Sequence, residues 1–207
     1  MPSAEIITIG SELLLGELVD TNSAHIAKSL RAAGIDLFRL NTIGDNVGRI
    51  SQAILDSLQR ADIIITTGGL GPTVDDPTRD AVAGAFNLSL QYHEELWQAI
   101  SNRLHKFGRT PGENQKKQAF VPSGSIILHN PVGTAPAFVI EQGDKCVISL
   151  PGVPSEMDYL LQHEVLPYLL NKYNIREVIK VRLIKTYFIG EGSLDEKIAA
   201  VSYTHLR

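Results

Sequence analysis

Short apolar runs alternate along this chain with longer segments in which apolar residues recur at about every third or fourth position. A short run bounded by turn residues indicates a buried strand, whereas the wider spacing indicates an amphipathic helix. The expected strands cover residues 5–10, 35–43, 63–65, 125–128, 137–140 and 146–150, with a further strand region at 175–189. Helices are expected between them, and this alternation is typical of an α/β fold whose parallel sheet is covered by helices.

Capping residues set the expected limits of the first helices. Thr21 or Asn22 can cap the first helix, and Gly34 lies where a glycine commonly ends one. Asn46 or Val47 opens the second helix. Later helices are expected near 79–85, near 94–107, after residue 156 and around 194–198.

The pattern divides the chain into a main domain at 1–172 and the start of a smaller C-terminal α+β subdomain at 173–207. The closing helix after Gly190 is too short to bury its apolar face by itself. We therefore expect a truncated subdomain and a chain that is part of a longer protein. Residues 202–207 are candidates for non-native sequence.

A glycine-rich segment at 66–78 follows the third expected strand and precedes a helix. Gly68, Gly69 and Gly71 carry no Cβ and tolerate positive φ, so an anionic ligand could approach their backbone N–H groups closely. The helix would begin at Pro77 or Thr78, and its N-terminus also favours an anion. This order of residues predicts a phosphate site.

Two adjacent acids, Asp75 and Asp76, lie in the same segment. Carboxylate oxygens are hard ligands that suit Mg²⁺ bridged to the phosphates of a substrate. The alternative is that the glycines serve packing and that the acids only cap a helix. No Gly-Lys-Ser or Gly-Lys-Thr sequence follows the glycines, which argues against a nucleoside-triphosphatase loop.

A second turn of this type, residues 151–156, follows the expected strand at 146–150. Gly152, Val153 and Ser155 could offer a second set of N–H groups, although Ser155 could equally be only an N-cap. Open α/β sheets bind ligands at the carboxyl ends of their strands, so we expect the two turns to face one crevice.

The amino-acid composition limits the classes of molecule and the cellular location that we expect for this chain. The formal net charge is −4 and no long run of lysine or arginine is present, so direct binding of nucleic acid is not expected. The single cysteine, Cys146, excludes an intramolecular disulfide and is expected to be a small buried side chain. Because neither a secretory signal nor a membrane-spanning run is evident, we expect a cytoplasmic location and no membrane association.

Five segments, taken together and in this order, resemble the N-terminal domain of the CinA (competence/damage-inducible) protein family. They are residues 9–22, 66–80, 114–122, 130–136 and 150–157. That domain is similar to the molybdopterin-binding fold of the molybdenum-cofactor (MoCF) biosynthesis proteins. The resemblance implies a three-layer α/β fold with a mostly parallel sheet and helices on both faces.

The resemblance also implies an activity. Several relatives are hydrolases that cleave the pyrophosphate of ADP-ribose to AMP and ribose 5-phosphate with a divalent metal ion, here Mg, Mn or Co. Full-length members often carry a C-terminal nicotinamide-nucleotide amidase domain, which links them to pyridine-nucleotide recycling. A homo-oligomer, with a dimer favoured, is implied as well.

On this hypothesis of an ADP-ribose pyrophosphatase, Asp75 and Asp76 hold the metal ion, with Asp20 as a third candidate, and Lys117 is a counter-charge to the phosphate. The remaining candidates are expected to bind the nucleotide or its phosphates: Ser11, Glu12, Asn22, Thr67, Gly68, Gly69, Gly71, Thr78, Asn130, Gly133, Gly152, Val153 and Ser155. Glu12 and Asp20 could instead be solvated loop acids.

Two other function classes stay open from the sequence. One is an adenylyltransferase or molybdopterin-binding protein of molybdenum-cofactor biosynthesis, because the same fold and paired acids can serve nucleotidyl transfer. The other is a non-catalytic nucleotide-binding module. The fold by itself does not choose among them.

Overall fold

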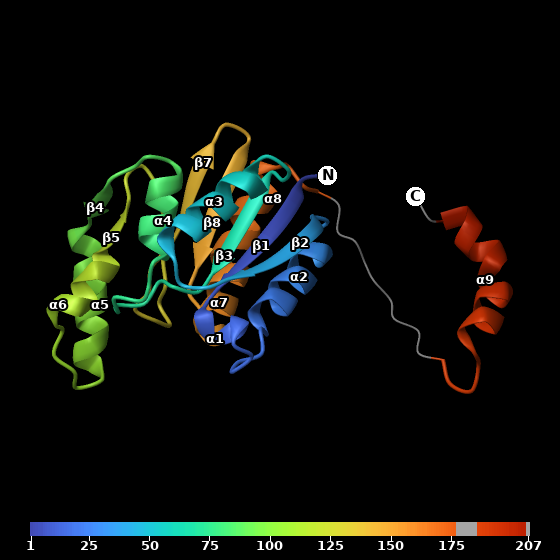
Figure 1. Cartoon of the computed structure of the whole chain (residues 1–207), viewed down its shortest axis with the longest axis horizontal. Helices are drawn as coiled ribbons and strands as arrows, with labels where there is room; N and C mark the ends of the chain where they lie inside the picture. The colour runs from blue at the N-terminus through green and yellow to red at the C-terminus, as the bar shows by residue number, and fades with distance from the viewer. Residues whose placement is uncertain (177–185, 206–207) are drawn as a thin grey trace.

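A computed structural model describes residues 1–176 and 186–205, and its centre is a six-stranded sheet in the order β2-β1-β3-β8-β7-β6 (Figure 1). The pairs β1–β2, β1–β3 and β3–β8 are parallel, whereas β7 runs antiparallel to both β8 and β6. The mostly parallel α/β fold expected from the sequence is confirmed.

The elements expected between residues 5 and 172 are present in the order predicted, and most ends agree within a few residues. The strands of this sheet are β1 (Ser3–Ile9), β2 (Asp36–Ile43), β3 (Ile63–Thr67), β6 (Ile126–Leu128), β7 (Ala137–Gln142) and β8 (Lys145–Leu150). The helices packed on it are α2 (Asn22–Ala32), α3 (Val47–Leu58), α4 (Thr78–Ala85), α7 (Pro154–Leu160) and α8 (Leu166–Lys172), with a π-helical turn η2 (Leu161–Val165) between the last two.

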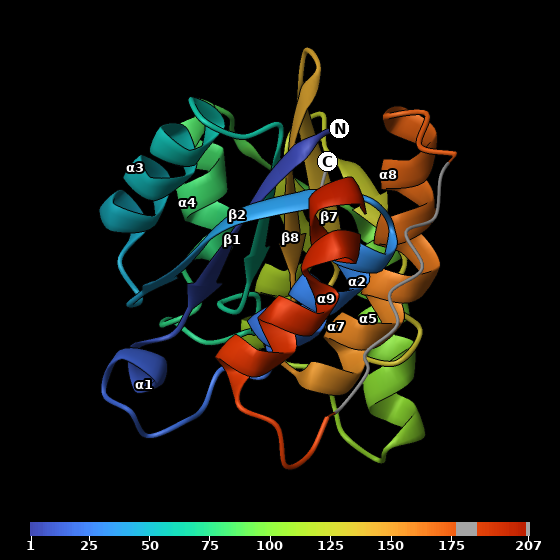
Figure 2. The same cartoon turned by 90° about the vertical axis from the view of Figure 1, so that its right-hand side faces the viewer.

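Alternate side chains of the strands enter two separate cores, one on each face of the sheet. On β3, Ile63 and Ile65 join the core beneath α2, α7 and α8, while Ile64 joins the core beneath α3 and α4. Figure 2 shows these two groups of helices on opposite sides of the sheet. The three-layer arrangement thus follows from the period-2 alternation of the strands.

The helix limits test the capping predictions. Asn46 is the N-cap of α3, and its side chain accepts a hydrogen bond of 3.0 Å from the N–H of Arg49. Gly34 follows α2 with a φ of 75° and ends it as expected. Thr21 is the N-cap of α2 but makes no side-chain cap bond, and Asp20 instead accepts from the N–H of Ser23 at 2.9 Å.

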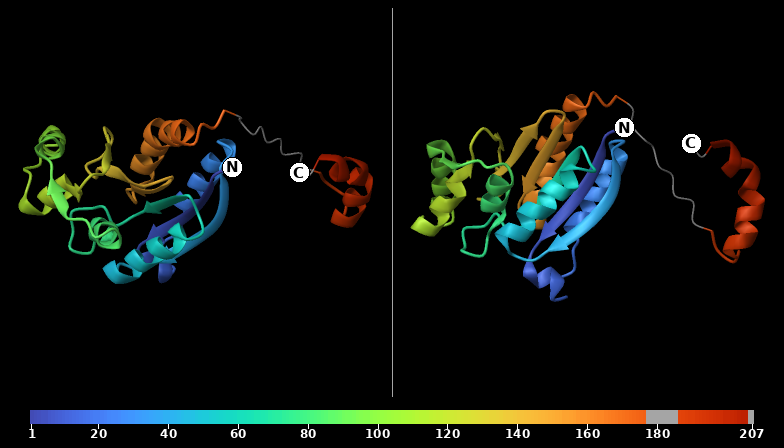
Figure 3. Two further views of the ribbon diagram at one scale, coloured as in Figure 1. Left: turned by 90° about the horizontal axis from the view of Figure 1, so that it is seen from above. Right: turned by 45° about the horizontal axis from the view of Figure 1, so that its top comes forward.

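The helix expected near 94–107 is present, but the lobe to which it belongs, beside the main sheet, was not predicted. The lobe contains the antiparallel pair β4 (Leu90–Tyr92) and β5 (Phe120–Pro122), and the helices α5 (Glu94–Lys106), α6 (Glu113–Lys116) and η1 (Lys117–Ala119). The lobe stands at one end of the domain in both views of Figure 3. Ile100, Leu104 and Ala119 form its small core. Three-residue strands are too short to show an alternating pattern, which is why the sequence did not reveal them.

The C-terminal predictions are tested only in part. Most of the strand region expected at 175–189 lies outside the described residues. The helix expected after it is present as α9 (Glu191–His205). No helix within residues 1–176 or 186–205 is long and apolar enough to cross a membrane.

Cys146 on β8 is 1% exposed, which confirms the predicted role as a small buried side chain. Its sulfur lies 3.7 Å from the hydroxyl of Tyr173. Burial raises the pKa of the Cys146 thiol to about 11, so at neutral pH it is protonated and a poor nucleophile.

A buried ion pair lies at the end of the sheet where the parallel strands begin. Glu5 on β1 is 1% exposed and accepts hydrogen bonds from Ser57 at 2.6 Å and from Arg60 at 2.9 Å. Burial alone raises the pKa of Glu5, but the bonds from Arg60 and Ser57 outweigh it and hold this pKa below the ordinary 4.5.

We expect Glu5→Gln to lower the free energy of unfolding by about 2 kcal/mol at pH 7, because charge-assisted hydrogen bonds are lost in a buried position. Since the pKa of Glu5 is depressed by folding, its contribution is complete above about pH 4.5 and declines as the pH falls through the folded pKa. Urea unfolding at pH 7 and at pH 4 measures both effects. Glu17→Gln, at an exposed position, is the control. An unchanged acid dependence in Glu5→Gln contradicts this role.

Candidate functional site

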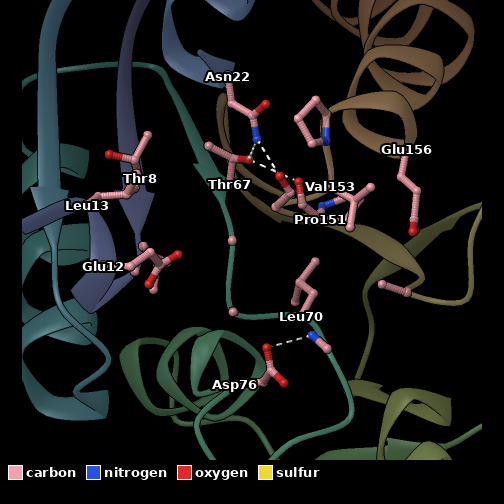
Figure 4. A pocket seen from close by; sticks show the side chains of 18 of the residues that line it. Thr8, Glu12, Leu13, Asn22, Thr67, Leu70, Asp76, Pro151, Val153 and Glu156 are labelled. Carbon is pink, nitrogen blue, oxygen red and sulfur yellow. Dashed lines mark hydrogen bonds between the residues drawn. The ribbon is translucent and has the colours of Figure 1, made fainter. Parts of the chain in front are cut away.

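The loops that follow β3 and β8 meet at the carboxyl edge of the sheet and line a cavity of about 720 Å³ (Figure 4). Segments after β1, before α2 and beside β7 complete its wall. The predicted common crevice of the two glycine-containing turns is therefore confirmed.

Hydrogen bonds tie the two loops together. The hydroxyl of Thr67 donates to the carbonyl of Pro151 at 3.0 Å. The Nδ2 of Asn22 donates to Thr67 at 3.1 Å and to the carbonyl of Gly152 at 2.9 Å. Figure 4 shows these contacts at the top of the cavity. Asn22 thus joins α2 to both loops, which is a positioning role that the sequence did not predict.

Gly68 lies against the backbone of Ile9 at the end of β1. Its φ is +106°, and a Cβ built on it would lie 2.1 Å from the carbonyl oxygen of Ile9. A Cβ on Gly152 would lie 3.3 Å from the Cα of Gly68, so the two loops approach backbone to backbone. A glycine is required at Gly68 for both conformation and space.

Two of the three glycine N–H groups expected to cradle a phosphate are already engaged. Gly68 donates to the carbonyl of Leu150 at 3.1 Å, and Gly71 donates to Asp76 at 2.8 Å. A phosphate could use these N–H groups only by displacing those bonds. The expectation that they are open to the ligand is therefore wrong for this structure, because the loop uses them for its own folding.

Asp76 shapes its own loop. Its carboxylate accepts hydrogen bonds from the N–H of Gly71 and from the N–H and hydroxyl of Thr73, at 2.8, 2.7 and 2.6 Å. It also lines the cavity (Figure 4). Asp75, its neighbour, is exposed, lines the cavity and makes no hydrogen bond or ion pair among the described residues.

A buried guanidinium lies behind the glycine loop. Arg79 on α4 is 3% exposed and donates to the carbonyls of Leu70 and Gly71, both at 2.7 Å. Burial lowers the pKa of Arg79, while the nearby charges of Asp76 and Asp80 raise it. Arg79 therefore holds the loop carbonyls and adds positive charge next to the acids of the site.

The opposite wall is built from the segment at 130–136 and the start of α7. The Nδ2 of Asn130 donates to the carbonyl of Ala135 at 2.8 Å and to the carboxylate of Glu156 at 2.7 Å. A Cβ on Gly133 would lie 1.7 Å from that carboxylate, so a side chain there would displace Glu156. Asn130 and Gly133 place Glu156, which lines the cavity.

The charges of the cavity are all of one sign. The acidic side chains lining it are Glu12, Asp20, Asp45, Asp75, Asp76 and Glu156. No lysine, arginine or histidine is among the described residues that line it. Such a cavity repels a phosphate group unless a cation accompanies it.

The structure brings most of the predicted site residues together. Those that line the cavity are Glu12, Asp20, Asn22, Thr67, Gly68, Gly69, Gly71, Asp75, Asp76, Gly152 and Val153. Those that do not are Ser11, Thr78, Lys117, Asn130, Gly133 and Ser155.

The predicted site residues that do not line the cavity differ from one another in their contacts. Thr78 is buried and donates to the carbonyl of Gly68 at 2.7 Å, so it supports the loop. Ser11 exchanges hydrogen bonds with Asp45 across the rim. Lys117 is exposed, and its role as a phosphate counter-charge stays a prediction. Ser155 is not the N-cap considered for α7, because Val153 occupies that position with Pro154 following it.

Two buried acceptors of the cavity wall were missed. Within the described part of the chain, Oδ1 of Asn22 and Oε1 of Gln118 are buried without a hydrogen-bond partner. The amide nitrogens of these residues donate to the carbonyls of Gly152 and Leu70, which fixes the oxygen of each amide as the unpaired atom. Only the fold places Gln118 here, because its lobe was not predicted.

The donor set suits a metal ion that shares its shell with a substrate. Residues 1–176 and 186–205 contain no preassembled group of three or more His, Cys, Asp or Glu side chains that could hold a metal ion. Mg²⁺ usually takes only one or two carboxylates and completes its shell with water and phosphate oxygens. The carboxylates of Glu12 and Asp75, which have no hydrogen-bond donor among the described residues, fit that mode.

Comparisons with known proteins agree with this architecture. A family model described as a probable molybdopterin binding domain matches residues 5–171. A putative competence-damage inducible protein of Alkaliphilus oremlandii is 45% identical over 94% of this chain, and one of Caldanaerobacter subterraneus is 43% identical over 94%. The chain spans about half the length of these curated relatives, 47% in each case.

Solved structures give the same result. The protein CinA of Thermoplasma acidophilum, a protein of unknown function, is 34% identical, with a TM-score of 0.73 over 83% of this chain and 97% of that one. The molybdopterin biosynthesis enzyme MoaB of Thermus thermophilus, at 21% identity and a TM-score of 0.52 over 83% of this chain and 95% of its own, shares the fold.

We predict that Gly68→Ala destabilises the protein by at least about 3 kcal/mol, because it adds a clash with Ile9 to the strain of a positive φ. Gly143→Ala is the matched control, since Gly143 also has a positive φ, of +60°, but has open space around it. We expect it to cost about 1 kcal/mol. Urea unfolding compares the two variants, and equal losses contradict the close approach of Gly68 to Ile9.

We predict that Arg79→Met loosens the glycine loop, because the carbonyl of Gly71 loses its side-chain donor and the carbonyl of Leu70 keeps only the bond of 3.3 Å from Gln118. The expected cost is about 2–3 kcal/mol of stability, with faster amide hydrogen exchange at Gly71. Arg49→Met, at an exposed position on α3, is the control. Unchanged exchange at Gly71 in a folded Arg79→Met protein would show that Arg79 does not hold this loop.

Proposed function

The chain belongs to the family of the competence-damage inducible (CinA) proteins with a probable molybdopterin binding domain, and from this premise we propose that it is a metal-dependent pyrophosphatase. Its proposed substrate is ADP-ribose or a related nucleotide. Water attacks one phosphorus of the pyrophosphate, the bridging P–O bond breaks, and AMP and ribose 5-phosphate leave. The proposed place of this reaction is pyridine-nucleotide recycling.

The proposal rests on one observation: the described charged side chains that line a cavity large enough for a nucleotide are all acidic. A volume of about 720 Å³ lies within the range of small-molecule and cofactor sites. Its acidic wall, with no basic side chain among the described lining residues, disfavours a bare pyrophosphate on electrostatic grounds. A divalent cation makes an anionic substrate and an acidic wall compatible.

The hydrogen bonds of the acids indicate which of them would hold the cation. The carboxylate of Asp76 accepts three hydrogen bonds from its own loop, and those of Asp20, Asp45 and Glu156 accept one each. Within the described part of the chain, no group donates a hydrogen bond to the carboxylate of Glu12 or of Asp75, so these carboxylate oxygens are available. When bound there, the metal ion would neutralise charge on the phosphates and lower the pKa of a water molecule. Asp76 would contribute through the field of its charge and by holding the loop.

The side chains of this chain would orient the substrate and limit access of water. The link of Thr67, Asn22 and Gly152 fixes one rim of the cavity, and Arg79 fixes the loop opposite it. Preorganised groups of this kind lower a barrier because they need no rearrangement during reaction. The nucleoside would occupy the part of the cavity away from the paired acids.

A second candidate is a protein that binds molybdopterin or transfers an adenylyl group to it. The description of the matching family model favours it, as does the fold shared with MoaB. Such a protein would require a pterin ligand and, for transfer, ATP. A module that binds a nucleotide without reaction is the third possibility, and the assay below separates the three.

We expect the purified chain to release AMP from ADP-ribose with Mg²⁺, Mn²⁺ or Co²⁺ and to release none in EDTA. Glu12→Gln and Asp75→Asn should each lower the rate at least about 100-fold, because each replaces a negatively charged ligand of the metal ion by a neutral amide of the same size. Chromatography of AMP measures the rate. Asp36→Asn, at an exposed position on the edge strand β2, is the control.

Three outcomes contradict the proposal. Equal AMP release in EDTA removes the metal from the reaction. Binding of ADP-ribose by a folded protein without AMP release supports a binding module, and tight binding of a pterin with no effect on ADP-ribose supports the second candidate. Circular dichroism of each sample establishes that the protein tested is folded.

A further inference from the structure

A second hollow adjoins the main cavity. Its volume is about 430 Å³, and it lies between the end of α5 and the segment at 130–136. Thr134 and Glu156 line both it and the main cavity, so the two are neighbouring compartments separated by these side chains. We call the second hollow the basic compartment.

The charge of the basic compartment is opposite to that of the main cavity. Arg103 and Arg109 line it, and Lys106 lines a further hollow of about 380 Å³ that shares Arg103 and Phe107 with it. None of these three cations has a carboxylate partner within 4.0 Å among the described residues. Unpaired cations gathered in a hollow of a chain with net charge −4 are a favourable place for an anion.

Arg103 is held in place without being neutralised. Its Nη1 donates to the carbonyl of Pro131 at 2.6 Å, and its Nη2 donates to the carbonyl of Val132. Its Cζ lies 5.5 Å from the ring centroid of Phe107, which is 69% exposed. Carbonyls and an aromatic ring orient a guanidinium but leave its positive charge uncompensated, and other N–H groups remain for a ligand.

The charges around the basic compartment indicate which of its side chains a phosphate would approach. A phosphate in the basic compartment is repelled by Glu156, which also lines the main cavity, and is attracted by Arg103 and Arg109. The guanidinium group binds phosphate through paired hydrogen bonds and needs no metal ion to do so. The two compartments therefore offer two ways to bind a phosphate, one through a metal ion and one through arginine.

We propose that the basic compartment binds a phosphate group directly, through Arg103 and Arg109, and that this phosphate belongs to the ligand whose pyrophosphate lies in the main cavity. The second half of this statement rests on the proposed function. The substrate class is then a nucleotide that carries a phosphate in addition to its pyrophosphate, such as ADP-ribose phosphorylated at its adenosine 2′-hydroxyl.

The first arm of the test needs no turnover. Phenylglyoxal modifies arginines of the full chain in EDTA, with and without inorganic phosphate, and mass spectrometry reports the rate at each site. Phosphate should slow the modification of Arg109 about fivefold at four times its Kd, by simple occupancy. Arg31 and Arg49, exposed on α2 and α3, are the controls. Equal rates with and without phosphate at Arg109, or equal protection at all these arginines, overturn the phosphate site.

The second arm tests whether the site belongs to the substrate. The 2′-phosphorylated ADP-ribose should have a KM about tenfold below that of ADP-ribose, and Arg109→Gln should abolish the difference at unchanged kcat. Arg31→Gln should retain it. Equal KM values in the wild-type protein overturn the shared ligand while the protection result stands. If neither nucleotide is hydrolysed, the proposed function is wrong. Calorimetry then measures the Kd of each nucleotide, and the ratio expected for the two KM values is expected for the two Kd values.

Discussion

The parallel pairing of β3 with β8 at the centre of the sheet is the constraint on which the site depends. It aligns Thr67 with Leu150, so the two loops leave the sheet side by side. Gly68 and Gly152 then approach backbone to backbone, so that a Cβ on Gly152 would lie 3.3 Å from the Cα of Gly68. The hydrogen bonds of Thr67 and Asn22 keep the loops together, and the cavity is the space that these loops enclose.

In the described part of this domain, the charged side chains have partners where they are buried, whereas those of the cavity do not have basic partners. At the far end of the sheet, buried Glu5 is paired with Arg60, and behind the glycine loop, buried Arg79 is satisfied by two carbonyls. The cavity itself is different, because six acids and no basic side chain are among the described residues that line it. Acids that repel one another are stable together only with water or cations between them, and the proposed metal-dependent reaction uses that property.

Much of the fold could be predicted from the sequence, because strand and helix periods are local. The order of the elements, the cap at Asn46 and the common crevice of the two turns were all predicted correctly. The details of the site depend on contacts between distant residues and could not be. Asn22 and Gly152, for example, are 130 positions apart. Glycines also indicated an open phosphate cradle, but local periodicity does not reveal that Leu150 and Asp76 occupy the N–H groups of Gly68 and Gly71.

The central claim is that the acidic cavity accepts a nucleotide pyrophosphate only together with a divalent cation. Calorimetric titration with an ADP-ribose analogue whose bridging oxygen is replaced by a methylene group tests this claim directly, because binding is measured without hydrolysis. The account predicts binding in Mn²⁺ that is lost in EDTA, and binding of Mn²⁺ that becomes tighter when the analogue is present, since linkage is reciprocal. Equal affinity of the analogue in Mn²⁺ and in EDTA would contradict it.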